Sequence, residues 1–243
     1  MTPAVAALCF DLDDTFWEVL PVLHRAEARV RAYLEGAHPE LAARITLEDM
    51  IAARRELAAA LPEHAHNMTW LRTEALARLA AQHGHDPAIG AQAFAVFIEA
   101  RHEVEFYPEV IDALPQLGAH YRLATLSNGN ACVHRIGIGH HFELTLNAES
   151  VGFAKPRPEA FLAVAERLGI SPAEMLYVGD HPDNDVRGAA AAGCRTAWVN
   201  RRGAPWLPEW GPPADLEVPD LAVLAQRLNK SRTLQRDQAY PLN

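Results

Sequence analysis

Short apolar runs alternate with helical patterns along much of this chain. The first run, Val5 to Cys9, ends at the polar stretch Phe10-Asp11-Leu12-Asp13-Asp14-Thr15. Short apolar runs bounded by polar residues are typical of strands buried on both faces of a parallel sheet. Further runs of this kind lie at 121–126, 143–146, 175–178 and 196–199. Because amphipathic stretches separate them, the pattern predicts an α/β fold with a doubly wound parallel sheet.

A second pattern fills residues 20–104, where apolar residues recur at helical spacing and no strand is evident. Four helices are predicted there. Thr46, followed by Asp49, resembles a capping box at the start of the second, with Asp in place of the usual Glu. Asp86-Pro87 reads as the N-cap and first residue of the fourth. These helices form an insertion after the first strand.

After residue 105 the α/β pattern resumes. A helix is expected from about 108 to Gly118, with a kink or an early end at Pro115, because an interior proline costs a helix about 3 kcal/mol. Other helices are predicted near 131–137, 158–169, 184–192 and 221–228. The proline-rich segment 201–219 is expected to wrap the surface. We therefore divide the chain into a core (1–16 and 105–228), a helical insertion (17–104) and a flexible tail (229–243).

Composition narrows the class of protein. The 243 residues are 49% hydrophobic, which supports a substantial core, and the formal charge is −9. That charge argues against a nucleic-acid polymer or an anionic membrane as the main partner and favours a small molecule. The three cysteines, Cys9, Cys132 and Cys194, suggest neither a disulfide framework nor a thiolate zinc site. With no signal peptide or membrane-spanning run evident, we expect a cytoplasmic protein.

The acidic stretch after the first run indicates the chemistry. Three carboxylates within residues 11–14 repel one another unless a cation lies among them, and oxygen ligands suit Mg²⁺. Alternation in an extended chain points Asp11 and Asp13 to the same side, about 6.6 Å apart. One carboxylate can then attack a substrate while the other transfers protons. A plain acidic turn at the end of a strand is the alternative, and the downstream residues argue against it.

Three more polar stretches follow predicted strands or precede helices, so the same edge of the sheet would collect them. Ser127-Asn128 follows one strand and offers a hydroxyl and backbone amides to phosphate oxygens. Lys155 supplies positive charge. Asp180 and Asp185, in Gly-Asp-His-Pro-Asp-Asn-Asp, supply further carboxylates for a metal. Taken singly, Ser127 would be a turn residue and Lys155 a solvated surface lysine.

In this order the motifs resemble the haloacid dehalogenase superfamily, in its phosphatase branch with a helical cap. The resemblance covers residues 5 to about 200 and implies a Rossmann-like core, with residues 17–104 as the cap. It implies that Asp11 is the nucleophile that forms an aspartyl-phosphate and that Asp13 is the acid and then the base. Thr15, Ser127, Asn128 and Lys155 would bind the phosphate. Asp11, the backbone carbonyl of Asp13, and Asp180 would bind Mg²⁺, with Asp185 supporting the metal or Lys155.

The substrate is less constrained. Local stretches, among them Pro21-Val22-Leu23 and Asn128-Gly129-Asn130, are also similar to bacterial flavin mononucleotide phosphatases of this branch. This likeness implies a small phosphorylated metabolite, such as flavin mononucleotide or another nucleotide. Trp17 and Trp70 are candidates for an aromatic wall against a planar ring. Trp17 would otherwise anchor the entry to the insertion, and Trp70 would otherwise pack within it.

Three other functions compete with a phosphatase. A 2-haloacid dehalogenase would share the Asp11 nucleophile, but it has no leaving alkoxide to protonate and does not carry an Asp at the position of Asp13. A signalling receiver also combines acids, Ser or Thr, and Lys around magnesium, but it is about half this length and places its paired acids differently. A non-catalytic phosphate-binding scaffold would hydrolyse no phosphate ester. The oligomeric state is not predicted.

Overall fold

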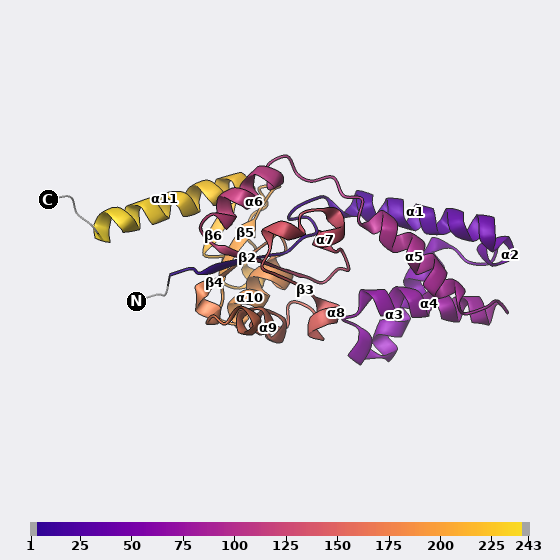
Figure 1. Cartoon of the computed structure of the whole chain (residues 1–243). Coiled ribbons are helices and arrows are strands. Elements are labelled where there is room, and N and C mark those ends of the chain that lie inside the picture. Colours follow the sequence, from indigo (N-terminus) through magenta and orange to yellow (C-terminus); the bar gives the residue numbers. More distant parts are fainter. Residues whose placement is uncertain (1–3, 240–243) are drawn as a thin grey trace.

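Six parallel strands form one sheet in the order β3-β2-β1-β4-β5-β6 (Figure 1). The computed structural model describes residues 4–239, with side chains for residues 4–230. The strands are β1 (Ala7–Phe10), β2 (Arg122–Ser127), β3 (Leu144–Asn147), β4 (Met175–Gly179), β5 (Arg195–Val199) and β6 (Leu216–Val218). All of β1 and β4 is buried, as their apolar runs predicted. The strand order reverses beside β1, and ligands bind at such switch points in α/β sheets.

Helices cover both faces of this sheet, so the predicted α/β class is confirmed (Figure 1). One apolar core joins α6 and α11 to the sheet, and a second joins α9 to the opposite face. The helices of this part are α6 (Val110–Gly118), α7 (Val133–Ile136), α8 (Ala148–Val151), α9 (Pro158–Leu168), α10 (Gly188–Ala191) and α11 (Leu221–Ala239). Helical turns of other types are the 3₁₀ turns η2 (Gly139–His141), η3 (Pro172–Glu174) and η5 (Pro208–Trp210) and the π-helical η4 (Pro182–Arg187).

Residues between β1 and α6 form a separate group of helices to one side of the sheet (Figure 1). They are α1 (Val19–Ala37), α2 (Pro39–Ala42), α3 (Leu47–Ala60), η1 (Pro62–His64), α4 (Met68–Gln82) and α5 (Ile89–Arg101). Leu34, Leu76 and Phe97 belong to an apolar core of their own. The four predicted helices are therefore present, with α2 and η1 in addition. The domain boundaries at 16/17 and 104/105 stay a prediction.

The chain enters and leaves the helical insertion at one place. Trp17 and Phe106 form an antiparallel bridge there, and their rings meet edge to face with centroids 5.9 Å apart. The backbone N–H of Tyr107 also donates to the carbonyl of Phe16 over 2.9 Å. Two segments about 90 residues apart in sequence are thus tied together at the base of the insertion.

The predicted helix starts and ends are confirmed in part. The Thr46–Asp49 capping box is present in both directions. The fourth helix begins at Ile89, two residues after the predicted start, with Asp86 accepting from the N–H of Ala88. Helix α6 ends at Gly118 as predicted and contains Pro115, so the early end is wrong and the kink stays a prediction.

The C-terminal region also differs from its prediction. The expected surface wrap contains β6, which pairs with β5 at the edge of the sheet. The helix predicted at 221–228 is present and longer, because α11 continues to Ala239. That residues 229–243 form a flexible tail stays a prediction, and residues 240–243 lie outside the described part of the chain. Among residues 4–239, no helix has the length and apolar character needed to span a bilayer.

Candidate active site

The carboxyl ends of β1, β2 and β4 meet at one edge of the sheet. Phe10 pairs with Thr125 on one side and Val178 on the other, and the N–H of Asp11 donates to the carbonyl of Val178 over 2.9 Å. Asp11 therefore emerges between the ends of two neighbouring strands. Ser127, the last residue of β2, and Asp180, which follows β4, reach the same edge, as the predicted parallel sheet requires.

Lys155 lies at the centre of the site and is 5% exposed. Its Nζ donates to Oδ1 of Asp11 at 2.6 Å, to Oδ1 of Asp185 at 2.7 Å and to the hydroxyl of Tyr177 at 2.7 Å. All three donors of the ammonium group are thus used. Lys155 is therefore buried and paired with two carboxylates, and the alternative prediction of a solvated surface lysine is wrong.

Tyr177 is a site residue that the sequence reasoning missed. It is fully buried in β4, and its hydroxyl donates to the carbonyl of Leu126 over 2.9 Å while accepting from Lys155. The signal was present in the sequence, because a phenol inside a strand buried on both faces needs a polar partner. Nothing in the sequence indicated that this partner would be Lys155.

Burial dominates the electrostatics of the acidic residues. Burial raises the pKa of Asp11, whereas the charge of Lys155 lowers it. The carboxylates of Asp185 and Asp180 raise this pKa further. Burial also raises the pKa of Asp180 to about 7, and repulsion from Asp185 and Asp14 adds to it. For Lys155, burial works to lower the pKa, but the Asp11 and Asp185 carboxylates outweigh it and the pKa rises. One lysine therefore does not relieve the repulsion among these acids.

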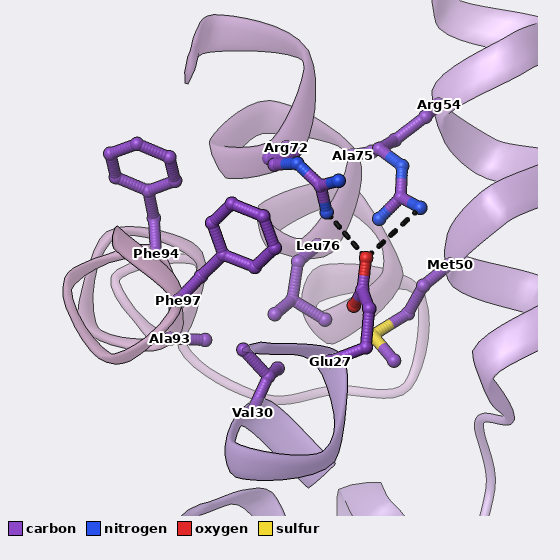
Figure 2. A pocket seen from close by; sticks show the side chains of 10 residues that line it. All are labelled: Glu27, Val30, Met50, Arg54, Arg72, Ala75, Leu76, Ala93, Phe94 and Phe97. Carbon is purple, nitrogen blue, oxygen red and sulfur yellow. Dashed lines mark hydrogen bonds and ion pairs between the residues drawn. The ribbon is translucent and has the colours of Figure 1, made fainter. Parts of the chain in front are cut away.

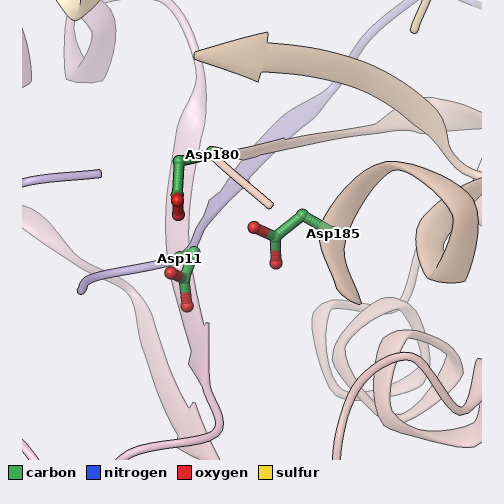
Figure 3. A group of neighbouring side chains, drawn as sticks. All are labelled: Asp11, Asp180 and Asp185. Carbon is green, nitrogen blue, oxygen red and sulfur yellow. The ribbon is translucent and has the colours of Figure 1, made fainter. Parts of the chain in front are cut away.

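Asp11, from the loop after β1, and Asp180 and Asp185, from the segment after β4, converge on one point (Figure 3). One oxygen from each lies within 4.8 Å of the others, which suits a hard divalent cation with oxygen ligands. The N–H of His181 donates to Oδ2 of Asp185 over 2.9 Å, and the indole N–H of Trp198 donates to the carbonyl of Asp180 over 2.7 Å. These hydrogen bonds orient two of the three residues. The donor set therefore fits the predicted Mg²⁺, and the predicted contact through the backbone carbonyl of Asp13 stays a prediction.

The predicted phosphate-binding residues border this group. Ser127 is buried at the end of β2, and its Oγ accepts from the N–H of Gly129 over 3.0 Å. The Asn128 side chain donates to the carbonyl of Lys155 at 2.9 Å and accepts from its N–H at 2.8 Å, so it holds the lysine backbone. The hydroxyl of Thr15 donates to Oδ1 of Asp180 over 3.4 Å. The structure thus brings the residues together, and their contact with a phosphate stays a prediction.

Asp13 points to different partners from the other acids. Nη2 of Arg101 donates to both of its carboxylate oxygens at 2.6 Å, and the indole N–H of Trp17 donates to Oδ1 at 2.9 Å. Arg101 is the last residue of α5 and is 1% exposed. Sequence reasoning missed this arginine, whose only signal is a charge at the end of an apolar helix.

The two tryptophans chosen as an aromatic wall are placed differently from that expectation. Trp17 is fully buried, so it has no face to offer a substrate; it packs at the base of the insertion, its alternative reading. Trp70 packs with Leu57 and Leu71 in a small apolar cluster and stacks on His64 with centroids 4.2 Å apart. Both tryptophans therefore pack against other side chains in this structure, and the aromatic wall stays a prediction.

A different group of aromatic residues borders the acids. A cavity of about 240 Å³ beside Asp180 is lined by Tyr107, Trp198 and Trp210. Trp198 also contacts Trp206 and Trp210 edge to face. Part of the predicted surface wrap therefore forms a wall of this cavity.

Comparison with known proteins agrees with this geometry. Residues 5–193 match the sequence model of the haloacid dehalogenase-like hydrolases. The chain is 30% identical to the 5-amino-6-(5-phospho-D-ribitylamino)uracil phosphatase of Escherichia coli, over 85% of this chain and 88% of that protein. It is 32% identical to the glyceraldehyde 3-phosphate phosphatase of Methanopyrus kandleri, over 96% of this chain and 100% of that one.

A solved structure is also similar along nearly its whole length. The 2-haloacid dehalogenase from Pseudomonas syringae superimposes with a TM-score of 0.88 at 33% identity, covering 93% of this chain and 99% of that one. The family match spans both the acidic loop after β1 and the Asp180–Asp185 segment. With its six-stranded sheet and the carboxylates at its edge, the chain belongs to the haloacid dehalogenase-like hydrolase family.

Proposed function

We propose that this protein is a Mg²⁺-dependent phosphomonoesterase that hydrolyses a small phosphorylated metabolite through an aspartyl-phosphate. The observation that carries the proposal is that one loop holds two acids, Asp11 and Asp13, in different surroundings. Asp11 lies among Lys155 and the metal-binding carboxylates, whereas Asp13 faces Arg101 and Trp17. Two acids held in separate environments suit separate roles as nucleophile and as proton carrier.

In the first half-reaction, a carboxylate oxygen of Asp11 attacks the phosphorus and the bond from phosphorus to the ester oxygen breaks. Asp13 gives its proton to the leaving alkoxide. Lys155 holds Oδ1 of Asp11 at 2.6 Å, which fixes the rotation of the nucleophile. Bound at Asp11, Asp180 and Asp185, Mg²⁺ would neutralise negative charge on the transferring group.

In the second half-reaction, Asp13 takes a proton from water, whose oxygen attacks the phosphorus of the aspartyl-phosphate. The bond from phosphorus to Asp11 breaks, which releases orthophosphate and restores the carboxylate. Ser127 and the backbone amides that follow it would hold the phosphate oxygens during both steps. The helices of residues 17–104 would act as a cap that excludes water and selects the substrate.

Dehalogenation of 2-haloacids is the second candidate, because several similar structures carry that name, one of them at 33% identity. It would use Asp11 to displace the halide and would need no acid for the leaving group. Asp13 therefore favours the phosphatase, since its carboxylate beside the nucleophile has no task in halide release.

One assay separates the candidates. The purified protein is given p-nitrophenyl phosphate with magnesium, or a 2-haloacid, and the release of phosphate or halide is measured. Release of phosphate, abolished by chelation, supports the proposal; release of halide alone would overturn it, and release of neither would indicate a non-catalytic scaffold.

A panel of phosphate monoesters then addresses the substrate. It should include flavin mononucleotide, which the local sequence resemblance suggests, and the substrates named for the two relatives. An acyclic metabolite and a nucleotide differ in the surface area that the active site must enclose. The ranking of their kcat/KM values therefore reports the shape of the enclosed site.

A further inference from the structure

Arg101 joins the helical insertion to the catalytic loop. It is the last residue of α5, is 1% exposed, and lies with its Nη2 2.6 Å from both oxygens of Asp13. Since Trp17 also donates to Oδ1, neither oxygen of this carboxylate lacks a donor. Asp13 is thus fully engaged on the side of the insertion.

This arrangement conflicts with the proposed work of Asp13. An acid that protonates a leaving alkoxide must turn an oxygen toward the substrate. Both oxygens of Asp13 instead accept from Arg101, and Oδ1 also accepts from Trp17. The contact between Arg101 and Asp13 must therefore open during the reaction, and the guanidinium then needs another anion, because an unpaired buried charge is costly.

Two features point to where that anion lies. Nη1 of Arg101 is buried and has no hydrogen-bond partner among the residues that the structure describes. A buried donor without an acceptor is rare in native proteins and indicates a group that binds there.

In addition, the pair of Arg101 and Asp13 lies directly against the turn that follows β2. A Cβ placed on Gly129 would come within 2.8 Å of Asp13 Oδ2, 3.1 Å of Arg101 Nη2 and 3.4 Å of Ser127 Oγ. Arg101 is therefore beside the turn proposed to hold the phosphate.

The charge behind Arg101 also favours an incoming anion. Further inside the insertion, Arg54 and Arg72 share the single carboxylate of Glu27 (Figure 2). Burial lowers the pKa of Arg72 to about 10, and repulsion from Arg54 and Arg101 contributes. Three guanidinium groups thus face two carboxylates, those of Glu27 and Asp13. A phosphate dianion at Arg101 would offset this excess of positive charge.

We infer that Arg101 is a substrate-binding residue whose guanidinium exchanges Asp13 for the phosphate group of the incoming monoester. The exchange frees Asp13 to carry and donate a proton. The end of α5 then stays fastened to the site through the ligand in place of Asp13. This inference rests on the proposed phosphatase function. It adds to the proposed site a phosphate-binding residue, Arg101, that the insertion contributes.

The test measures phosphate binding, which does not require turnover. Orthophosphate is titrated with magnesium into the wild type, Arg101→Met, Arg101→Lys and the control Arg135→Met, and the Kd is determined by calorimetry. Arg135 of α7 is a suitable control because it pairs with Glu99, which lies on α5 as Arg101 does, and because its side chain is about half exposed. We expect Arg101→Met to raise the Kd at least tenfold, Arg101→Lys to recover part of the loss, and Arg135→Met to stay within twofold of the wild type.

Arg101→Met leaves the Asp13 carboxylate unpaired, which could prevent folding. A second pair of variants avoids this problem. Asp13→Asn and the double variant Asp13→Asn/Arg101→Met differ only in the arginine, in a background where the Asp13 charge is absent. The double variant is expected to bind orthophosphate at least tenfold more weakly. Equal Kd values in this pair, or an unchanged Kd with a lower kcat in Arg101→Met, would overturn the inference and leave Arg101 as a positioning residue for Asp13.

Turnover by the wild type separates this inference from the proposed function. A wild type that hydrolyses p-nitrophenyl phosphate, with orthophosphate binding indifferent to Arg101, would refute only the role of Arg101. A wild type that neither hydrolyses the ester nor binds orthophosphate would refute both.

Discussion

Lys155 Nζ lies 2.6 Å from Asp11 Oδ1, although the two residues are 144 positions apart in the sequence. The contact is buried and is shared with Asp185. A lysine held in this way cannot rotate freely, so it fixes the carboxylate that we propose as the nucleophile. The same ammonium group would neutralise charge as the phosphoryl group is transferred.

Replacing Asp11 by Asn is expected to abolish turnover while retaining the fold. Asn keeps the size of the side chain and an oxygen for Lys155, but its amide is a poor nucleophile. The loss of kcat should be several powers of ten, because the covalent step cannot occur. Hydrolysis of p-nitrophenyl phosphate at more than about a hundredth of the wild-type rate would contradict the aspartyl-phosphate mechanism.

Asp13→Asn is expected to impair alkyl phosphates much more than p-nitrophenyl phosphate. The nitrophenolate leaves without a proton, whereas an alkoxide needs the acid. The comparison is the ratio of kcat/KM for the two esters in the wild type and in the variant. Equal losses on both would instead assign Asp13 to metal binding, to structure, or to activation of water in the second half-reaction.

Stability of the metal-free protein should fall as the pH rises from about 4 to 7 through the contribution of Asp180. Its pKa is about 7 in the folded protein, above the usual 3.8, because of burial first and then of Asp185 and Asp14. The folded state therefore binds this proton more tightly than the unfolded state, and deprotonation costs folding free energy. Magnesium binds the deprotonated form, so its stabilising effect should grow over the same pH range.

The measurement is the difference in Tm with and without magnesium, at pH 5.5 and at pH 8. Magnesium at 100 times its Kd adds about 2.7 kcal/mol, which corresponds to a rise of roughly 5–10 °C in a chain of this size. Asp180→Asn serves as the control, because it removes the titrating group. A magnesium effect that is the same at both pH values would argue against Asp180 as a metal ligand.

Gly179→Ala is expected to reduce activity and magnesium affinity together. A Cβ on Gly179, the last residue of β4, would overlap the carboxylate of Asp185, which must then leave both Lys155 and the metal group. Gly36→Ala is the matched control. No atom lies within 4 Å of a Cβ at Gly36 near the end of α1, so this change should leave activity intact and stabilise the helix by up to about 1 kcal/mol.

Trp17→Leu is expected to destabilise the fold without changing substrate preference. The indole is fully buried, packs on Phe16 and Phe106, and donates to Asp13. Leu fills part of the space, so the loss of packing should cost up to about 3 kcal/mol, the low end of the range for a buried Trp→Ala change. Thermal unfolding gives the stability, and the kcat/KM ratio of flavin mononucleotide to phosphoglycolate gives the preference.

Trp70→Leu provides the comparison, because Trp70 lies in a smaller cluster and is partly exposed. Its cost in stability should be smaller than that of Trp17→Leu. A selective loss of flavin mononucleotide hydrolysis in either variant would restore that tryptophan as part of the substrate wall.

The sequence alone determined the parts of this protein that depend on local pattern. Apolar runs specified the central strands, because a strand buried on both faces tolerates few polar residues. Parallel strands place their carboxyl ends together, so the residues that follow them were expected to meet, and Asp11, Asp180 and Asp185 do so. The Thr46–Asp49 capping box was equally readable, because its hydrogen bonds join residues only three apart.

Tertiary structure decided the partners of those residues. Arg101 reaches Asp13 across 88 positions, and Tyr177 reaches Lys155 across 22, through packing that leaves no periodic signal in the sequence. It also decided that Trp17 is buried rather than exposed to substrate, because its surroundings come from segments at both ends of the helical insertion. Local pattern thus located the acids of the site, whereas long-range packing determined which cations they face.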